Sequence, residues 1–194
     1  MAAMSTLGHI LSKCNVTLER RRYHHDSCLA YIVDTLLERK PDHISLYADI
    51  EGCRINGGTV PPDLVLTDQV PDLVIVDSSS SPTTVYLVEL TIPWDSDTMI
   101  NNAYSRKKVR YTYLSSDIEN NGYTCLNLPL EIGTRGVITT RNKEVLFSLT
   151  KLCKSSQTKS FIKKLGKIAL LGSYRIYLAR NTTDWSPAAL SRLQ

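Results

Sequence analysis

Two short apolar runs, residues 71–77 (PDLVIVD) and 84–91 (TVYLVELT), constrain the fold of this chain more than any other feature. Both are rich in β-branched residues, and a Ser-rich segment with a proline separates them, so they predict an antiparallel β-hairpin. Each run is almost continuously apolar, which is typical of strands that are buried on both faces of a sheet. The sequence therefore predicts a central sheet covered by helices.

The rest of the chain supplies further strands and the helices that would cover this sheet. Apolar periodicity, capping residues and turn residues set the limits of each expected element. We expect a helix over 26–39, a strand over 43–49, an irregular connection over 50–70, a helix from about 95 to 119, strands over 123–132 and 136–140, a helix over 142–154 and a basic helix over 156–181, whose end, 173–179, also fits a strand. Such an order predicts an α/β domain.

Size and cysteine usage limit the class of protein. The chain has 194 residues, enough for one α/β domain with a real core. Its N-terminus lacks the apolar stretch of a secretory signal, and no run approaches the roughly 18 apolar residues of a membrane span. Its five cysteines are scattered without a C-x-x-C pair, so we expect neither a disulfide framework nor a zinc site. We expect a soluble protein of the reducing nucleus or cytoplasm.

The charge is divided between the two halves of the chain. Residues 1–99 contain 7 Lys and Arg against 14 Asp and Glu, whereas residues 100–194 contain 16 against 5. A basic half indicates a polyanionic partner, and a group of carboxylates in the other half indicates a cation. The alternative is a solvated basic face with no partner.

Two acids of the predicted hairpin could share a metal ion. Asp72 begins the first run and Glu89 is near the end of the second, so an antiparallel pairing places both at the same end of the sheet. Carboxylates suit Mg²⁺, which keeps several waters and also accepts phosphate oxygens. One alternative is that these acids bind no metal and are only hydrated at the edge of the sheet. The other is that Asp63 takes the place of Asp72.

The helix predicted after Glu89 carries a cation within its apolar face. The face has helical spacing and consists of Ile100, Ala103, Lys107, Tyr111, Leu114 and Ile118. An ammonium that faces the sheet would pair with the two carboxylates and could orient a water. The alternative is that the stem of Lys107 only covers apolar surface. Lys108 and Arg110 would point more outward, towards phosphates.

These residues carry a family resemblance. Pro71-Asp72, followed by Glu89-Leu90-Thr91, resembles the PD-(D/E)XK nuclease signature, with Thr91 in the place of the usual lysine. The run AYSRKKVRY at 103–111 looks like the restriction-like endonuclease domain of site-specific non-LTR retrotransposons, in which the catalytic lysine has moved to this helix. The resemblance implies a PD-(D/E)XK core, a mixed sheet flanked by helices.

It also implies the roles of individual residues. Asp72, Glu89 and Lys107 would be catalytic, and Asp72, Glu89 and the Leu90 carbonyl would hold Mg²⁺ or Mn²⁺. The basic residues that would bind nucleic acid are Arg106, Lys108, Arg110, Arg135, Lys163, Lys164 and Lys167. The expected activity is nicking of a DNA strand by an activated water, and in such elements the 3′ end then primes reverse transcription.

The resemblance also implies a division of the chain into two parts, and it implies the partners that the chain would bind. Residues 1–25 resemble the remnant of a zinc knuckle (His9 and Cys14 in H-x₄-C) and a basic linker, and residues 26–194 would be the endonuclease domain. Two knuckle cysteines are missing, so zinc is not expected. DNA is the implied partner, with RNA or the reverse transcriptase of the parent element as further ones. The alternatives are a catalytically inactive nucleic-acid-binding remnant and a protein-interaction module.

Overall fold

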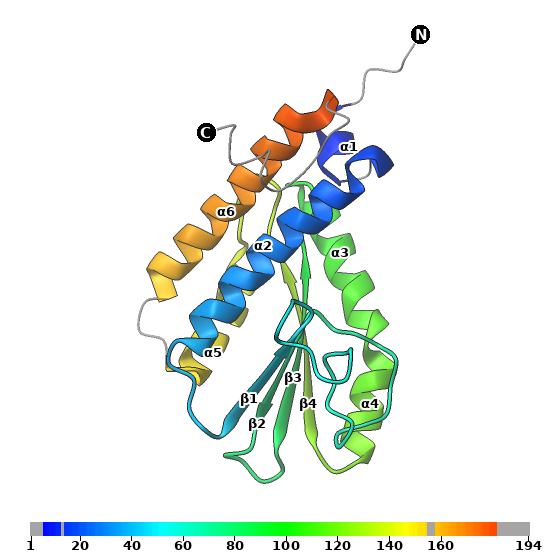
Figure 1. The fold of residues 1–194 in the computed structure, drawn as a ribbon, viewed down its shortest axis with the longest axis vertical. Helices are drawn as coiled ribbons and strands as arrows, with labels where there is room; N and C mark the ends of the chain where they lie inside the picture. The colour runs from blue at the N-terminus through cyan, green and yellow to red at the C-terminus, as the bar shows by residue number, and fades with distance from the viewer. Residues whose placement is uncertain (1–5, 13, 155–157, 182–194) are drawn as a thin grey trace.

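A four-stranded mixed sheet flanked by helices forms the protein in the computed structural model, which describes residues 6–12, 14–154 and 158–181 (Figure 1). The strands are β1 (Ile44–Ala48), β2 (Leu73–Asp77), β3 (Thr84–Thr91) and β4 (Thr124–Glu131). The helices are α1 (Leu7–Ser12), α2 (Leu18–Leu37), α3 (Asp97–Arg110), α4 (Thr112–Asn120), α5 (Thr140–Leu152) and α6 (Thr158–Leu178), with 3-10 turns η1 (Asn15–Thr17) and η2 (Ala179–Asn181). The mixed α/β architecture predicted from the sequence is confirmed.

The predicted hairpin is present at the centre of the sheet. Strands β1, β2 and β3 are antiparallel, with Leu73 opposite Val88 in the β2–β3 pair. Strand β4 runs parallel to β3. Helices α3 and α4 connect the two strands and return the chain from the end of β3 to the level of its first residue, where β4 begins. Most residues of β2 and β3 are buried, as their apolar runs predict.

Each face of the sheet packs against its own hydrophobic cluster. Leu73 and Leu90 belong to the cluster that includes residues of α2, α5 and α6. Val74 and Leu87 belong to the other, which includes Tyr111 and residues of α4. Because side chains alternate along a strand, Glu89 lies on the same face as Leu87 and is directed towards α3. Figure 1 shows α2 and α6 on one side of the sheet and α3 and α4 on the other.

The helix predicted after Glu89 forms, with a break at Tyr111. Ser96 caps its start by accepting a hydrogen bond from the Met99 N–H. The predicted apolar face is correct, because its apolar members are buried: Ile100, Ala103, Tyr111, Leu114 and Ile118. The predicted basic helix also forms as α6, and its last part is helical. No helix in the described parts of the chain is long and apolar enough to cross a membrane.

Two predictions about local structure are wrong. Helix α2 begins at Leu18, eight residues before the predicted start, and so crosses the suggested division at residue 25. No strand forms over 136–140. Gly136 instead has a φ of 82° and packs against the backbone of Gly166, and the Thr139 side chain caps α5 by accepting from the Asn142 N–H. A turn and a helix cap therefore replace the expected strand. Residues 182–194 of the predicted domain lie outside the described residues.

A buried histidine lies where α2 meets α6. His24 is only 3% exposed, and its ring lies against the backbone of Gly172. Burial lowers the pKa of His24 to about 4, although a hydrogen bond with the Ala169 backbone acts in the opposite direction. The imidazole is therefore uncharged at neutral pH, as its apolar position requires.

Gly172→Ala should lower the free energy of unfolding by about 1–3 kcal/mol, because the new methyl group would overlap the His24 ring. Urea denaturation followed by circular dichroism measures the change. Gly58→Ala is the control, because the nearest atom to its added Cβ, the Ile55 carbonyl oxygen, would be 3.9 Å away. A Gly172→Ala protein as stable as the control would contradict this packing.

Candidate active site

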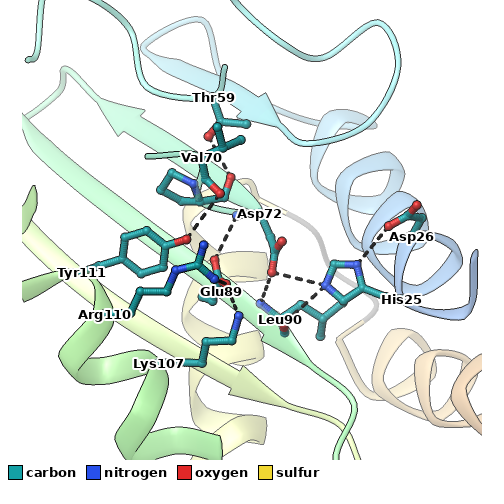
Figure 2. A network of polar contacts seen from close by, with 11 residues as sticks. His25, Asp26, Thr59, Val70, Asp72, Glu89, Leu90, Lys107, Arg110 and Tyr111 are labelled. Carbon is teal, nitrogen blue, oxygen red and sulfur yellow. Dashed lines mark hydrogen bonds and ion pairs between the residues drawn. The ribbon is translucent and has the colours of Figure 1, made fainter. Parts of the chain in front are cut away.

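Asp72 and Glu89 meet at one end of the β2–β3 hairpin. Asp72 immediately precedes β2, and its backbone N–H donates to Oε2 of Glu89 at 3.2 Å. Oδ2 of Asp72 accepts from the Leu90 N–H at 2.8 Å. Figure 2 shows both residues at the end of the strands, with the Asp72 carboxylate directed towards His25 and the Glu89 carboxylate towards Lys107 and Arg110. The hairpin geometry therefore brings together the three residues that the sequence assigned to a metal.

The segment before Asp72 is fixed by two side chains from other parts of the chain. The buried Thr59 hydroxyl donates to the Pro71 carbonyl at 2.7 Å, and the Tyr111 hydroxyl donates to the Val70 carbonyl at 3.3 Å. Burial raises the pKa of Tyr111 above its usual range, and the nearby Glu89 charge raises it further. Tyr111 therefore stays a neutral donor, and it positions the loop that carries Asp72.

Two cations of α3 neutralise Glu89. Its side chain is only 3% exposed, and an ionised carboxylate in such a place needs a partner. The Lys107 ammonium pairs with Oε1, and the Arg110 guanidinium lies 3.3 Å from the same oxygen. Lys107 thus faces the sheet and the carboxylates, where the apolar face of α3 predicted it (Figure 2). Thr91, in the place of the usual lysine, has a buried hydroxyl with no hydrogen-bond partner within the described residues.

His25 completes the site from the opposite side. It extends from α2, and its Nε2 lies 3.3 Å from Oδ2 of Asp72 and 3.3 Å from the Leu90 carbonyl oxygen. Its Nδ1 lies 3.0 Å from Oδ1 of Asp26. Burial lowers the pKa of His25, but the hydrogen bonds with Asp26 and Asp72 outweigh burial and raise it to about 10. The imidazole is therefore a cation at neutral pH.

Sequence reasoning did not select His25 for the site, although the spacing of His25 from the apolar residues that follow it indicated its position. The residue lies four positions before Leu29, a buried apolar residue of α2, so it lies one turn before Leu29 on the same side of the helix. The helix expected over 26–39 leaves both histidines outside it. The true start at Leu18 places His25 within the helix and above the strand ends.

No family model matches the chain, and a search of curated proteins found no similar sequence. The chemistry of the site is therefore inferred from its residues.

A pocket of about 440 Å³ opens beside the site. Its lining comes from α1, α2, the chain from Leu90 onward and α3, and it includes Arg21, His25, Thr91, Arg106 and Lys107. Lys107 and His25 therefore both border this pocket. Of the predicted nucleic-acid-binding residues, Arg106 lines this pocket and Arg110 belongs to the site itself.

The other predicted basic residues lie elsewhere. The Lys108 ammonium donates to the Asn127 carbonyl at 2.8 Å, and Arg135 pairs with Asp95 at 3.3 Å. Three exposed lysines lie on α6, which packs on the other face of the sheet from α3: Lys163, Lys164 and Lys167. The fold therefore separates the basic residues of α3 from those of α6.

The donor set fits a divalent cation. Within residues 6–12, 14–154 and 158–181, no three His, Cys, Asp or Glu side chains form a group that could hold a metal. However, Mg²⁺ is held in many sites by one or two carboxylates, with waters and phosphate oxygens as its other ligands. The Asp72 carboxylate and the Leu90 carbonyl already share one cationic neighbour, the His25 imidazolium. The oxygens at this end of the strands therefore already face one positive charge, that of His25.

Proposed function

We propose that this chain is a metal-dependent endodeoxyribonuclease of the PD-(D/E)XK type, which nicks DNA by hydrolysis of a phosphodiester. The observation that carries the proposal is the meeting of Asp72, Glu89 and Leu90 at one end of the strands, with the Lys107 ammonium on Glu89, beside an open pocket. The resemblance to retrotransposon endonuclease domains supports the same assignment, as does the mixed sheet flanked by helices.

Each residue of the site has a role in this reaction. Asp72, Glu89 and the Leu90 carbonyl would hold Mg²⁺ or Mn²⁺. The bound ion supplies a positive charge next to the phosphate and lowers the pKa of a coordinated water. Lys107, held by Glu89, stabilises the negative charge that develops on the phosphate oxygens. Arg110 keeps Glu89 neutralised from the same helix.

The surroundings of the site suit a nucleic-acid strand. The pocket has Arg21 and Arg106 in its lining, together with apolar residues such as Met99. Arginines bind phosphates, and apolar side chains can pack against sugars. We expect the strand to enter between α2 and α3, with the scissile phosphate next to Lys107.

A plasmid-nicking assay tests the proposal. Supercoiled DNA is incubated with the full chain and Mg²⁺ or Mn²⁺, and the rate of open-circle formation is measured with and without EDTA. Nicking that requires the ion and that is absent from an Asp72→Ala protein prepared in the same way supports the proposal. DNA binding without nicking under any of these conditions would instead indicate the inactive remnant.

Affinity for duplex DNA should fall steeply as salt is added, because each neutralised phosphate releases counterions. Arg106→Gln should reduce the slope of log affinity against log salt by about one, because Arg106 borders the site. Fluorescence anisotropy with a labelled duplex measures the slope. Lys164→Gln on α6 is the matched control and should change it less. A salt-independent affinity would favour a protein partner over DNA.

A further inference from the structure

Helix α6 has an outer face that points away from the core. Its inner face is buried and consists of Phe161, Leu165, Ala169, Ser173 and Ile176. A line of exposed side chains, spaced three or four positions apart, forms an outer stripe: Lys159, Lys163, Lys167, Leu170, Tyr174 and Tyr177. At about 1.5 Å per residue the outer stripe is about 27 Å long. It lies on the other side of the sheet from α3 (Figure 1).

The charges of α6 do not favour the helix itself. Residues 158–181 include six Lys and Arg but no Asp or Glu. Lys159, Lys163 and Lys167 are four positions apart, so like charges meet on adjacent turns. Lys159 also lies in the first turn, where the helix dipole favours an anion. Phosphates that neutralise these ammonium groups would relieve both effects, so the outer stripe complements a polyanion.

The other half of the outer stripe is apolar and aromatic. Leu170, Tyr174 and Tyr177 are 47%, 54% and 38% exposed. The Arg180 guanidinium lies over the Tyr177 ring, 4.0 Å from its centroid, and donates to the Tyr177 carbonyl at 2.8 Å. Bases of a single strand stack on exposed aromatic rings, and arginine adds a cation beside them, whereas the bases of a duplex are already stacked on each other. Lysines followed by tyrosines therefore fit a single strand better than a duplex.

The order of the side chains also favours DNA over the other polyanionic partners. A helix on a membrane surface inserts an apolar face along its length, but here three lysines occupy the same line as Leu170 and the tyrosines. Leu170 lies between Lys167 and Tyr174, where the sugar between a bound phosphate and a stacked base would pack. Deoxyribose lacks the 2′-hydroxyl that ribose would bury against this apolar side chain.

We propose that the outer stripe of α6 binds single-stranded DNA. Its lysines bind the phosphates, and Tyr174 and Tyr177 stack on the bases. This surface is separate from the pocket of the candidate active site, whose lining within the described residues comes from other elements. The proposal concerns binding alone, so it does not depend on whether the chain cuts DNA.

Photocrosslinking locates the strand without any substitution. A single strand of about 15 nucleotides that contains 5-iododeoxyuridine is irradiated with the full chain in EDTA, so that no strand is cut. The crosslinked peptides are then mapped by mass spectrometry. Crosslinks should fall on Tyr174 or Tyr177. Crosslinks found only on other elements, such as those that line the pocket, would overturn the proposal.

Fluorescence anisotropy with the same strand supplies a second readout. Tyr174→Ala should weaken binding by about tenfold and Tyr174→Phe by less than about twofold, because stacking needs only the ring. Lys163→Gln combined with Lys167→Gln should reduce the slope of log affinity against log salt by about 1.4. Lys164→Gln is the matched control and should leave the slope nearly unchanged. Its ammonium lies 4.7 Å from the centroid of the Tyr31 ring, off the outer stripe.

Other ligands separate the rival partners. Tyr174→Ala should leave the affinity for a duplex of the same sequence within about twofold, because a duplex offers no free base to stack. RNA of the same sequence that binds as tightly as the DNA strand, or anionic phosphatidylserine vesicles whose binding requires Tyr174, would overturn DNA as the ligand. A chain that nicks duplex DNA without these effects on α6 would overturn this inference and leave the proposed function. Single-strand binding at α6 in a chain that never nicks would do the reverse.

Discussion

An Asp72→Ala protein should nick DNA about a thousandfold more slowly than the unchanged chain. Asp72 provides a carboxylate oxygen that accepts from the Leu90 N–H, so its loss removes a charged ligand from the expected ion. A bound ion contributes several kcal/mol to the stabilisation of charge in the transition state, and each 1.36 kcal/mol corresponds to about tenfold in rate. Single-turnover conversion of supercoiled to open-circle plasmid measures the effect.

The chain offers a matched control for this substitution. Asp63 follows a proline as Asp72 does, and it was the sequence-based alternative for the same role. It is exposed, and its backbone carbonyl accepts from the Tyr123 hydroxyl at 3.4 Å, on the side where the connection meets α4. Asp63→Ala should keep the rate within about twofold. Equal losses in the two variants would show that neither aspartate has a specific place in the chemistry.

The hairpin and the Lys107 face could be predicted because both depend on local periodicity. Alternation along β3 places Glu89 on a buried face, and helical spacing places Lys107 on the face that meets it. Each pattern lies within one element, and the pairing of β2 with β3 follows from a short connection. Sequence reasoning could therefore bring Asp72, Glu89 and Lys107 to one end of the sheet.

The role of His25 and the distribution of the basic residues could not be predicted in the same way. His25 approaches Asp72 from 47 residues earlier in the chain, and its position depends on how α2 packs across the sheet. The start of α2 was also obscured, because residues 18–25 contain three arginines and two histidines instead of a regular apolar pattern. Lys163 and Arg106 are both basic, yet tertiary packing places them on opposite faces.

The failed strand at 136–140 shows a different limit. Its β-branched residues favour an extended strand, but Ile138 is buried in the cluster beneath the sheet, and Thr139 caps α5. Gly136 also needs a positive φ and a close approach to Gly166. Tertiary packing and helix capping therefore override the local preference of this segment.

Lys107→Ala should reduce nicking by about 10²–10³-fold while folding and DNA binding stay nearly intact. The ammonium pairs with Glu89 in the free protein, so in the proposed reaction it would already be held beside the phosphate, and the loss of one such donor typically costs this factor. The fold should persist because Arg110, 3.3 Å from the same carboxylate oxygen, still neutralises Glu89. Thr91 cannot substitute, since its hydroxyl carries no charge. Single-turnover nicking, urea denaturation and anisotropy measure the three properties.

Lys108→Ala is the matched control for this last effect. Lys108 is the next residue of α3, but its ammonium donates to the Asn127 carbonyl and makes no contact with Glu89. Its loss should weaken DNA binding slightly and leave the single-turnover rate within about threefold. A Lys107→Ala protein that nicks at the unchanged rate would show that the ammonium serves only to neutralise Glu89. In that case the Lys107–Glu89 pair is a structural ion pair, and the inactive remnant becomes the better account of the chain.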